Sequence, residues 1–156
     1  MDKNTDLDRI DVRILTALQG DSDQAIAELS ESVGLSANAC WRRIKRLEEL
    51  GIIRGRVALL DPMKLNLGVT VFVAIRTNEH NDAWLQKFNE AVAQIPEIVE
   101  LYRMSGEVDY LMKVVVADIA HYDRVYKRLI SLVKLTDVSS SFAMEQMKYT
   151  TALPVA

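Results

Sequence analysis

The segment from residue 36 to residue 50 places apolar and basic side chains on opposite sides of an α-helix. At about 100° per residue, Cys40, Ile44 and Leu47 fall on one stripe, and basic side chains fall opposite them. The segment begins with a serine, a preferred N-cap, and Gly51 follows where a left-handed residue closes a helix. We therefore predict an amphipathic helix whose basic face suits a phosphate-lined groove.

Positive charge is concentrated around this helix, although the whole chain carries a formal net charge of -3. Between positions 42 and 56 the only acidic residues are Glu48 and Glu49. The basic residues of this stretch are Arg42, Arg43, Lys45, Arg46, Arg54 and Arg56. Acidic residues are concentrated before Leu35 instead, so we expect one side of the N-terminal region to be basic and to face nucleic acid.

Two shorter helical segments precede the basic helix. Residues 8–19 and residues 25–33 each repeat apolar side chains at helical spacing, and Gly34 and Leu35 form a tight turn after the second of them. A helix, a short turn and another helix make up the motif that places its second helix in the major groove of DNA. The N-terminal region therefore predicts a helix-turn-helix.

Residues 52–60 are rich in β-branched side chains and contain Arg54 and Arg56. This composition suits a short strand, a small wing whose arginines lie beside a phosphate backbone. The composition then changes, and proline and glycine appear across residues 61–68, where we place a linker. We expect residues 1–60 to form a winged helix-turn-helix DNA-binding domain.

The remainder, residues 69–156, alternates strand and helix patterns in the order βαββαβ. The predicted strands cover residues 69–76, 98–104, 110–116 and 138–149, and the predicted helices cover residues 82–94 and 119–133. This order is that of a ferredoxin-like (ACT-like) αβ sandwich, with two helices on one face of an antiparallel sheet. The chain as a whole is predicted to be an α+β protein of two domains.

Both faces of the predicted sheet are apolar. In the first strand Val71, Val73 and Ile75 alternate with Phe72 and Ala74, so neither set is polar. The helices can cover only one face, and a second copy of the same sheet is the simplest cover for the other. We therefore expect a symmetric homodimer, which also presents two reading helices to half-sites one turn of DNA apart.

The turn at residues 105–110 supports two interpretations. In one, it is an ordinary hairpin connection in which Gly106 supplies a positive φ and Asp109 caps a backbone amide. In the other, Gly106 lets the backbone approach a small ligand whose ammonium group binds Asp109, at a place where two subunits meet. The spacing alone leaves both open.

Catalytic and metal-binding patterns are sparse. His80 and His121 are isolated from other ligand residues, the single cysteine Cys40 lies on an apolar helix face, and no phosphate loop or nucleophile elbow occurs. We expect no enzymatic activity, no metal and no cofactor. No apolar run suits a membrane span, the first residues do not have the pattern of a signal peptide, and one cysteine fits a reducing compartment, so we expect a cytoplasmic protein without membrane partners.

We expect double-stranded DNA to be contacted by the polar face of the basic helix and by the wing. Near the helix start, Ser36 and Asn38 suit base edges, whereas Arg42 and Lys45 suit phosphates or bases equally. Trp41 is as compatible with packing in the core as with a contact to a base. The alternative interpretation of the whole helix is a solvated amphipathic helix whose charged face binds nothing. The candidate DNA contacts are Ser36, Ala37, Asn38, Trp41, Arg42, Lys45, Arg46, Arg54 and Arg56.

Five segments in order, LDRIDVRILTALQ, LSANACWRRIKRLEELGII, ALLDPMKLNLG, SGEVDYLMKV and SSFAMEQMKYTTALP, resemble the Lrp/AsnC (leucine-responsive/asparagine, or feast/famine) family of prokaryotic transcription regulators. The resemblance implies a DNA-binding motif over Ile26–Lys45 with the recognition helix starting at Ser36. It also implies a sandwich that dimerises, often assembles into octamers, and binds small effectors, usually amino acids, between subunits. The helix Asn-Ala-Cys-Trp and the tail most resemble the cysteine-responsive activators of that family.

The same resemblance implies which positions respond to the effector. Glu107 and Val108 depart from the pattern of many members, which leaves the effector unidentified. The βαββαβ sandwich by itself is also compatible with an amino-acid-binding regulatory subunit of a metabolic enzyme, which is the alternative function. That alternative leaves residues 1–60 without a role. The matched effector positions are Met104, Ser105, Gly106, Asp109, Tyr110, Ile119, Ser141, Phe142 and Ala143.

Overall fold

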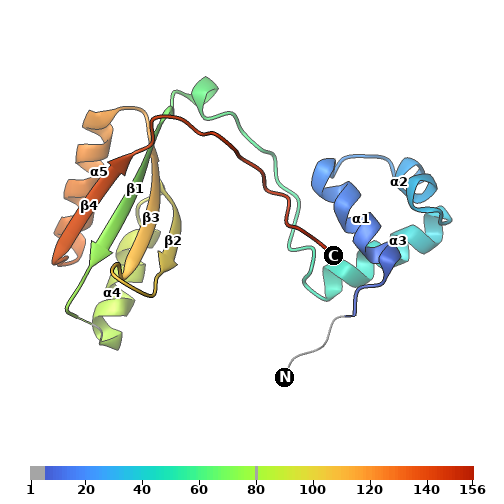
Figure 1. Ribbon diagram of the computed structural model, residues 1–156, viewed down its shortest axis with the longest axis horizontal. Coiled ribbons are helices and arrows are strands. Elements are labelled where there is room, and N and C mark those ends of the chain that lie inside the picture. Colours follow the sequence, from blue (N-terminus) through green and yellow to red (C-terminus); the bar gives the residue numbers. More distant parts are fainter. Residues whose placement is uncertain (1–5, 80) are drawn as a thin grey trace. The chain divides into compact units, whose positions relative to one another are not determined.

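The computed structural model describes residues 6–79 and 81–156 and divides the chain into two compact units (Figure 1). The first, the helical unit, reaches Leu59 and also includes Lys148–Ala156. The second, the sandwich unit, spans Leu60–Met147. The end of the chain, which the sequence pattern assigned to the sandwich, thus groups with the helices.

The helical unit holds the three predicted helices around one apolar core. Its helices are α1 (Arg9–Gly20), α2 (Ile26–Val33) and α3 (Ala37–Glu49). Between α2 and α3, Gly34 adopts a φ of 75°, a conformation that costs a glycine little, and the side chain of Ser36 caps α3 by accepting from the amide of Ala39 at 3.3 Å. The helix-turn-helix predicted from periodicity and capping is confirmed.

The predicted wing strand is absent from the described residues. Ile52 and Ile53 instead fold back on α3, where both amides donate to the carbonyl of Leu47 and both side chains pack on the helical core. After them the chain runs extended and exposed, with Val57 80% accessible. A strand requires a hydrogen-bonding partner, and no part of residues 6–79 or 81–156 pairs with this segment.

The last residues of the chain are held against α1. The side-chain oxygen of Gln19 accepts from the amide of Leu153 at 2.6 Å, and its nitrogen donates to the carbonyl of Leu153 at 3.1 Å. Val155 packs against the helical core. This two-way amide contact explains why the tail belongs to the helical unit.

The sandwich unit has the predicted order βαββαβ. Its elements are β1 (Val69–Arg76), α4 (Asp82–Ala93), β2 (Ile98–Arg103), β3 (Tyr110–Val116), α5 (Ile119–Leu132) and β4 (Asp137–Phe142), after a short 3-10 helix, η1 (Met63–Leu65). The antiparallel strands lie in the order β2-β3-β1-β4, and α4 and α5 cover one face of the sheet (Figure 1). The ferredoxin-like topology is confirmed.

The last strand is shorter than predicted, because its partner ends. Phe142 lies opposite Val71, and the amide of Ala143 donates to the carbonyl of Thr70 at 2.9 Å. The partner strand begins one residue earlier, at Val69, so a longer β4 has no edge to pair with. The residues from Met144 onward therefore leave the sheet, and this side chain is 97% exposed.

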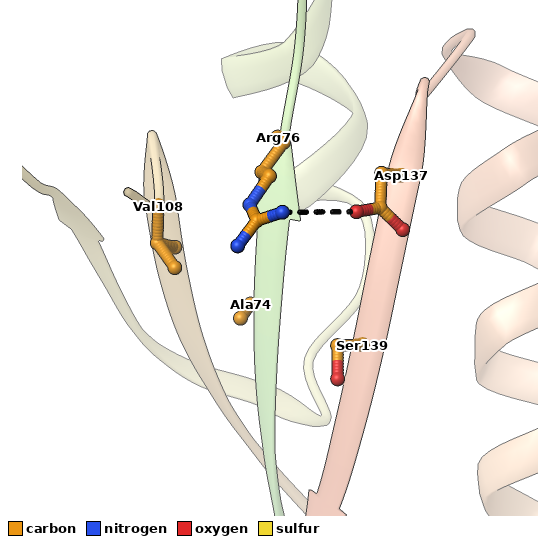
Figure 2. Close-up of a pocket in the computed structure, with 5 residues that line it drawn as sticks. All are labelled: Ala74, Arg76, Val108, Asp137 and Ser139. Carbon is orange, nitrogen blue, oxygen red and sulfur yellow. Dashed lines mark ion pairs between the residues drawn. The ribbon is translucent and has the colours of Figure 1, made fainter. Parts of the chain in front are cut away.

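The sheet face turned away from α4 and α5, here called the open face, has an apolar side and a polar side. Strands β1, β2 and β3 place Phe72, Tyr102, Leu111 and Val115 on it, and Phe72 is 40% exposed. On the β4 side the side chains are polar or charged, as Figure 2 shows for part of this region. They are Arg76, Asp137, Ser139 and Ser141. The ion pair between Lys113 and Glu100, 3.0 Å apart, also lies on the open face, directly beside Phe72. The open face thus carries apolar side chains around one ion pair on β1, β2 and β3, and polar side chains along β4 and at Arg76.

Candidate nucleic-acid interface and effector site

The exposed face of α3 carries the residues predicted to contact DNA. Cys40, Ile44 and Leu47 are buried in the helical core, as the periodicity predicted, and burial raises the pKa of the Cys40 thiol. Trp41 is 52% exposed, so about half of its surface is free of packing contacts. The remaining exposed candidates on this helix and at its cap are Ser36, Ala37, Asn38, Arg42, Lys45 and Arg46.

A carboxylate near the end of α3 pairs with two of the predicted basic contacts. Glu48 lies 2.7 Å from the Nζ of Lys45 and 3.2 Å from the Nη1 of Arg56. The hydrogen bond from Lys45 is the main reason why the pKa of Glu48 lies below its usual value. Arg56 is thereby held beside α3 although the described residues contain no wing strand, and both Arg54 and Arg56 are exposed.

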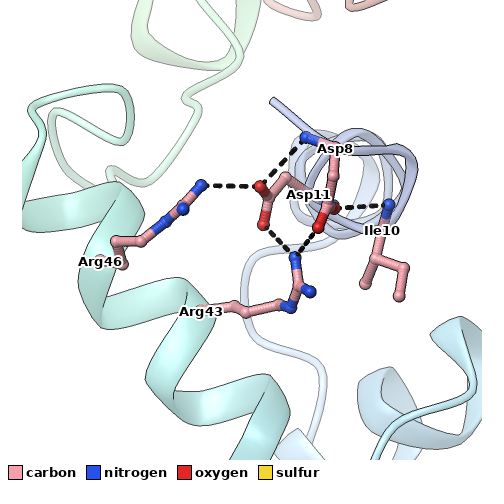
Figure 3. Close-up of polar contacts among 5 residues, drawn as sticks. All are labelled: Asp8, Ile10, Asp11, Arg43 and Arg46. Atoms are coloured by element: carbon pink, nitrogen blue, oxygen red, sulfur yellow. Dashed lines mark hydrogen bonds and ion pairs between the residues drawn. The ribbon is translucent and has the colours of Figure 1, made fainter. Parts of the chain in front are cut away.

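The opposite side of α3 is fastened to α1 by ion pairs (Figure 3). Asp11 is completely buried, and its two oxygens accept from the Nη1 of Arg43 at 2.9 Å and from the Nη2 of Arg46 at 2.8 Å. Arg43 also donates to Asp8, the N-cap of α1, and this hydrogen bond is the main cause that lowers the pKa of the Asp8 carboxyl. The buried charge is therefore compensated on both oxygens.

This network orients the helix that the sequence identified as the reading helix. Arg46, predicted as a DNA contact, has its guanidinium on Asp11 while half of its side chain remains exposed. A single acidic residue on the apolar stripe of the first helix, at Asp11 beside Ile14 and Leu15, is the sequence signal that could have indicated a buried ion pair. Its partner Arg43 was not among the predicted functional residues.

α1 also fixes the helix-turn-helix from its other side. Arg13 donates from Nη1 to the carbonyl of Val33 at 3.3 Å and from Nη2 to the carbonyl of Ser32. These are carbonyls at the C-terminal end of α2, where a positive charge also complements the helix dipole. α1 is thus the frame against which both helices of the motif are held.

The effector positions at the turn between β2 and β3 are largely engaged by the protein itself. One carboxylate oxygen of Asp109 accepts from the amide of Thr77 at 2.8 Å. Tyr110 is only 6% exposed, and its ring lies 5.0 Å from that of Phe88 in the sandwich core. Gly106 has a φ of 120°, so the features of the hairpin interpretation are present here.

The other effector positions lie toward the opposite end of the sheet. Ile119 begins α5 and is 69% exposed, and the ring of Phe142 meets that of Tyr122 edge-on at 5.3 Å. Ala143 pairs with Thr70, whereas Tyr110 lies opposite Ile75. At about 3.3 Å per residue, the two groups are roughly 15 Å apart along β1. One small molecule cannot touch both groups within one chain.

Metal ligands do not converge in the described part of the chain. Within residues 6–79 and 81–156, no three histidine, cysteine or acidic side chains lie close enough to hold an ion. His121 lies 3.1 Å from Glu97, and His80 lies outside the described residues. Among the helices described, none is both long and apolar enough to cross a membrane.

Comparison with known proteins places both units in one family. Residues 70–153 match the Lrp/AsnC ligand binding domain, and residues 7–54 match a winged helix-turn-helix DNA-binding domain. The glutamate uptake regulatory protein of Zymomonas mobilis subsp. mobilis is 56% identical over 149 residues, covering 96% of this chain and 91% of that protein. The match over residues 7–54 indicates DNA binding for the N-terminal region. A regulatory subunit of a metabolic enzyme would leave that region without a role.

Two solved structures resemble this chain over nearly its whole length. An AsnC family transcriptional regulator from Agrobacterium tumefaciens has 60% sequence identity and a TM-score of 0.91, covering 94% of this chain and 96% of that one. A transcriptional regulator from Neisseria meningitidis, solved in complex with L-methionine, has 37% identity and a TM-score of 0.90, covering 96% and 97%.

A DNA-binding helix-turn-helix joined to a ligand-binding αβ sandwich defines a transcription regulator that responds to a small molecule. The five segments that resemble this family are distributed over both units. The chain belongs to the Lrp/AsnC family.

Proposed function

We propose that this regulator binds DNA through the exposed face of α3, as a homodimer or an assembly of dimers such as an octamer, and that a free amino acid changes its assembly or its DNA binding. The observation that supports the DNA surface best is the basic, exposed face of α3 combined with the ion pairs of Asp11 on its other side. This role is one of binding rather than catalysis, and it belongs in the cytoplasm, where genomic DNA lies.

The proposed contacts divide by their position on α3. Ser36, Ala37 and Asn38 lie at the N-terminal end, which in helix-turn-helix proteins approaches the base edges, and Trp41 lies one turn further. Arg42 and Lys45 follow on the same exposed face and suit phosphates. Arg46, Arg54 and Arg56 extend the positive surface.

Replacing both Arg42 and Lys45 by alanine is expected to weaken binding to a target DNA fragment by at least about tenfold. If each contacts one phosphate, the slope of log affinity against log salt concentration falls by about 1.8, because each phosphate contact contributes about 0.9. Electrophoretic shifts over a salt series measure both quantities. The matched control is Arg124→Ala with Lys127→Ala, which removes the same charge from the exposed side of α5. Equal losses in both double variants, or none in the first, would contradict the assignment.

The proposed dimer uses the apolar side of the open face. Phe72, Tyr102 and Leu111 lie on three neighbouring strands with no helix over them. A two-fold axis brings the same surface of a second copy against them and removes these side chains from water. Such a dimer also supplies the second α3 that a two-fold DNA site requires.

The Phe72→Asp variant is expected to raise the dissociation constant of the dimer by about 100-fold or more, because it buries a further carboxylate in the interface. The lysine opposite this position, Lys113, is already paired with Glu100. The isolated subunit tolerates the change, since Phe72 is 40% exposed there. Analytical ultracentrifugation over a concentration series measures the association, and circular dichroism confirms the fold. Phe72→Leu, which keeps the apolar character, is the control and stays dimeric. A Phe72→Asp variant that associates like the parent would show that another surface is used.

The nature of the effector is suggested by the relatives. One is named for glutamate uptake, another was solved with L-methionine, and the reading helix and tail resemble cysteine-responsive members. We therefore propose that the effector is a free amino acid and that L-glutamate, L-methionine and L-cysteine are the first to test. To regulate, it must bind one assembly or DNA-binding state more tightly than the other.

A further inference from the structure

The basic cluster around α3 is largely neutralised by carboxylates of the helical unit itself. Of its six basic residues, four form ion pairs with Asp8, Asp11 or Glu48. The other two have no carboxylate partner within residues 6–79 and 81–156. The paired residues are Arg43, Lys45, Arg46 and Arg56, and the others are Arg42 and Arg54.

The carboxylates differ in their surroundings. Asp11 is completely buried, so its ion pairs fix α3 against α1. The side chain of Glu48 is 25% exposed and pairs with two cations that are themselves exposed, Lys45 at 2.7 Å and Arg56 at 3.2 Å. Both cations are among the proposed DNA contacts. The ion pairs of Glu48 can therefore open toward a ligand on the outer surface of α3.

The stability of α3 does not explain a carboxylate at position 48. Glu48 lies in the last turn of the helix, where the helix dipole favours positive rather than negative charge. Lys45 precedes Glu48 by three positions, which is the less favourable order for an ion pair within a helix. Exposed pairs of this kind add little to folding stability. The consequence of Glu48 is therefore to be sought in what else binds Lys45 and Arg56.

A DNA phosphate and the Glu48 carboxylate are alternative acceptors for the same two cations. We propose that Glu48 competes with DNA phosphates for Lys45 and Arg56 and thereby lowers the affinity of the regulator for DNA, because its ion pairs must open before these side chains reach the backbone. This inference rests on the proposed DNA-binding face of α3 and specifies which residue of that face limits its affinity.

The competition acts on phosphate contacts and not on base contacts. Glu48 follows Asn38 by ten positions, which corresponds to about 15 Å along the helix axis. The bases that the N-terminal end of α3 approaches are thus out of reach of Glu48. Non-specific binding consists almost entirely of phosphate contacts. Glu48 therefore reduces the binding of the regulator to the large excess of DNA that contains no target site.

The test is a fluorescence anisotropy titration of the full-length protein with a DNA duplex of scrambled sequence. At low salt, Glu48→Gln is expected to tighten binding by about five- to tenfold, whereas Glu49→Gln tightens it by at most about twofold. Glu49 is the matched control, since it is adjacent and exposed, has no ion pair among the described residues, and its replacement changes the net charge equally. The difference between the variants is expected to shrink as salt screens the ion pairs of Glu48.

A background without the two cations isolates the ion pairs from the charge of Glu48. In a Lys45→Ala, Arg56→Ala double variant, Glu48→Gln and Glu49→Gln are expected to change the affinity for DNA equally, because Glu48 has lost both of its partners. Glutamine has nearly the shape of glutamate, and thermal melts followed by circular dichroism confirm that each variant keeps the parent fold.

The outcomes separate the competition from the DNA-binding face on which it rests. If Glu48→Gln and Glu49→Gln tighten binding equally in the parent background, only the net charge matters and the competition is wrong. Weaker binding of Glu48→Gln would show that the carboxylate positions the two cations for DNA, which also overturns it. If Arg42→Ala with Lys45→Ala weakens binding but Glu48→Gln has no effect, only the competition is wrong. If neither changes binding, the assigned face is wrong and the competition with it.

Discussion

Replacing Asp11 by alanine is expected to lower the free energy of unfolding of the helical unit by about 3 kcal/mol. Asp11 is fully buried and accepts from Arg43 and Arg46, so its removal leaves two guanidinium groups without their acceptor. Breaking a buried ion pair costs about 3–5 kcal/mol, and the value here lies at the lower end because the arginine side chains are 31% and 50% exposed and regain water. We also expect α3 to be held less firmly against α1 and the affinity for DNA to fall.

The single cysteine gives a direct measurement of this effect. Cys40 is completely buried in the helical core, so alkylation of its thiol requires that the unit opens. When opening is reversible and fast, a loss of about 3 kcal/mol raises the alkylation rate by about two orders of magnitude. Asp6→Ala removes an exposed carboxylate just before α1 and is the control, with the parent rate. A rate in Asp11→Ala within about twofold of the parent would mean that the network adds little stability.

Local patterns predicted the elements of both units well. The period of Cys40, Ile44 and Leu47 identified the buried stripe of α3. The alternation in β1 separated the two faces of the strand but did not indicate which of them the helices cover. Where a prediction was wrong, the deciding factor was a partner elsewhere in the chain. Residues 52–60 have strand propensity, but no strand pairs with them in the described part of the chain. β4 ends at Phe142 because β1 begins at Val69.

Contacts between segments that are distant in sequence limited the prediction of the candidate sites even more. Asp11 and Arg46 are 35 positions apart, and their contact depends on how α1 crosses α3, which no periodicity encodes. Arg76 and Asp137 become neighbours only through the register of β1 with β4. The exposed face of α3 could be predicted because one helix contains it. The pairing of Arg76 with Asp137 could not, because the two residues lie on strands that are distant in sequence.

The Phe88→Ala variant is expected to destabilise the sandwich unit by about 3–5 kcal/mol. Phe88 is fully buried, and its ring lies 5.0 Å from the rings of both Trp84 and Tyr110, so the deletion removes the centre of an aromatic cluster. α4 and the sheet meet through these three residues and cannot close the cavity without moving together. Ile130→Ala, on a half-exposed position of α5, is the control and is expected to cost less than about 1 kcal/mol.

Each unit carries its own reporter, so the two large effects can be separated. In a Trp41→Phe background, fluorescence of Trp84 during urea unfolding follows the sandwich unit, while Cys40 alkylation follows the helical unit. The two apolar cores have no residue in common, so Phe88→Ala is expected to shift the Trp84 transition and to leave the alkylation rate at the parent value. A Phe88→Ala variant that also exposes Cys40 would show that the units unfold as one cooperative body, through the tail on Gln19 or through the linker.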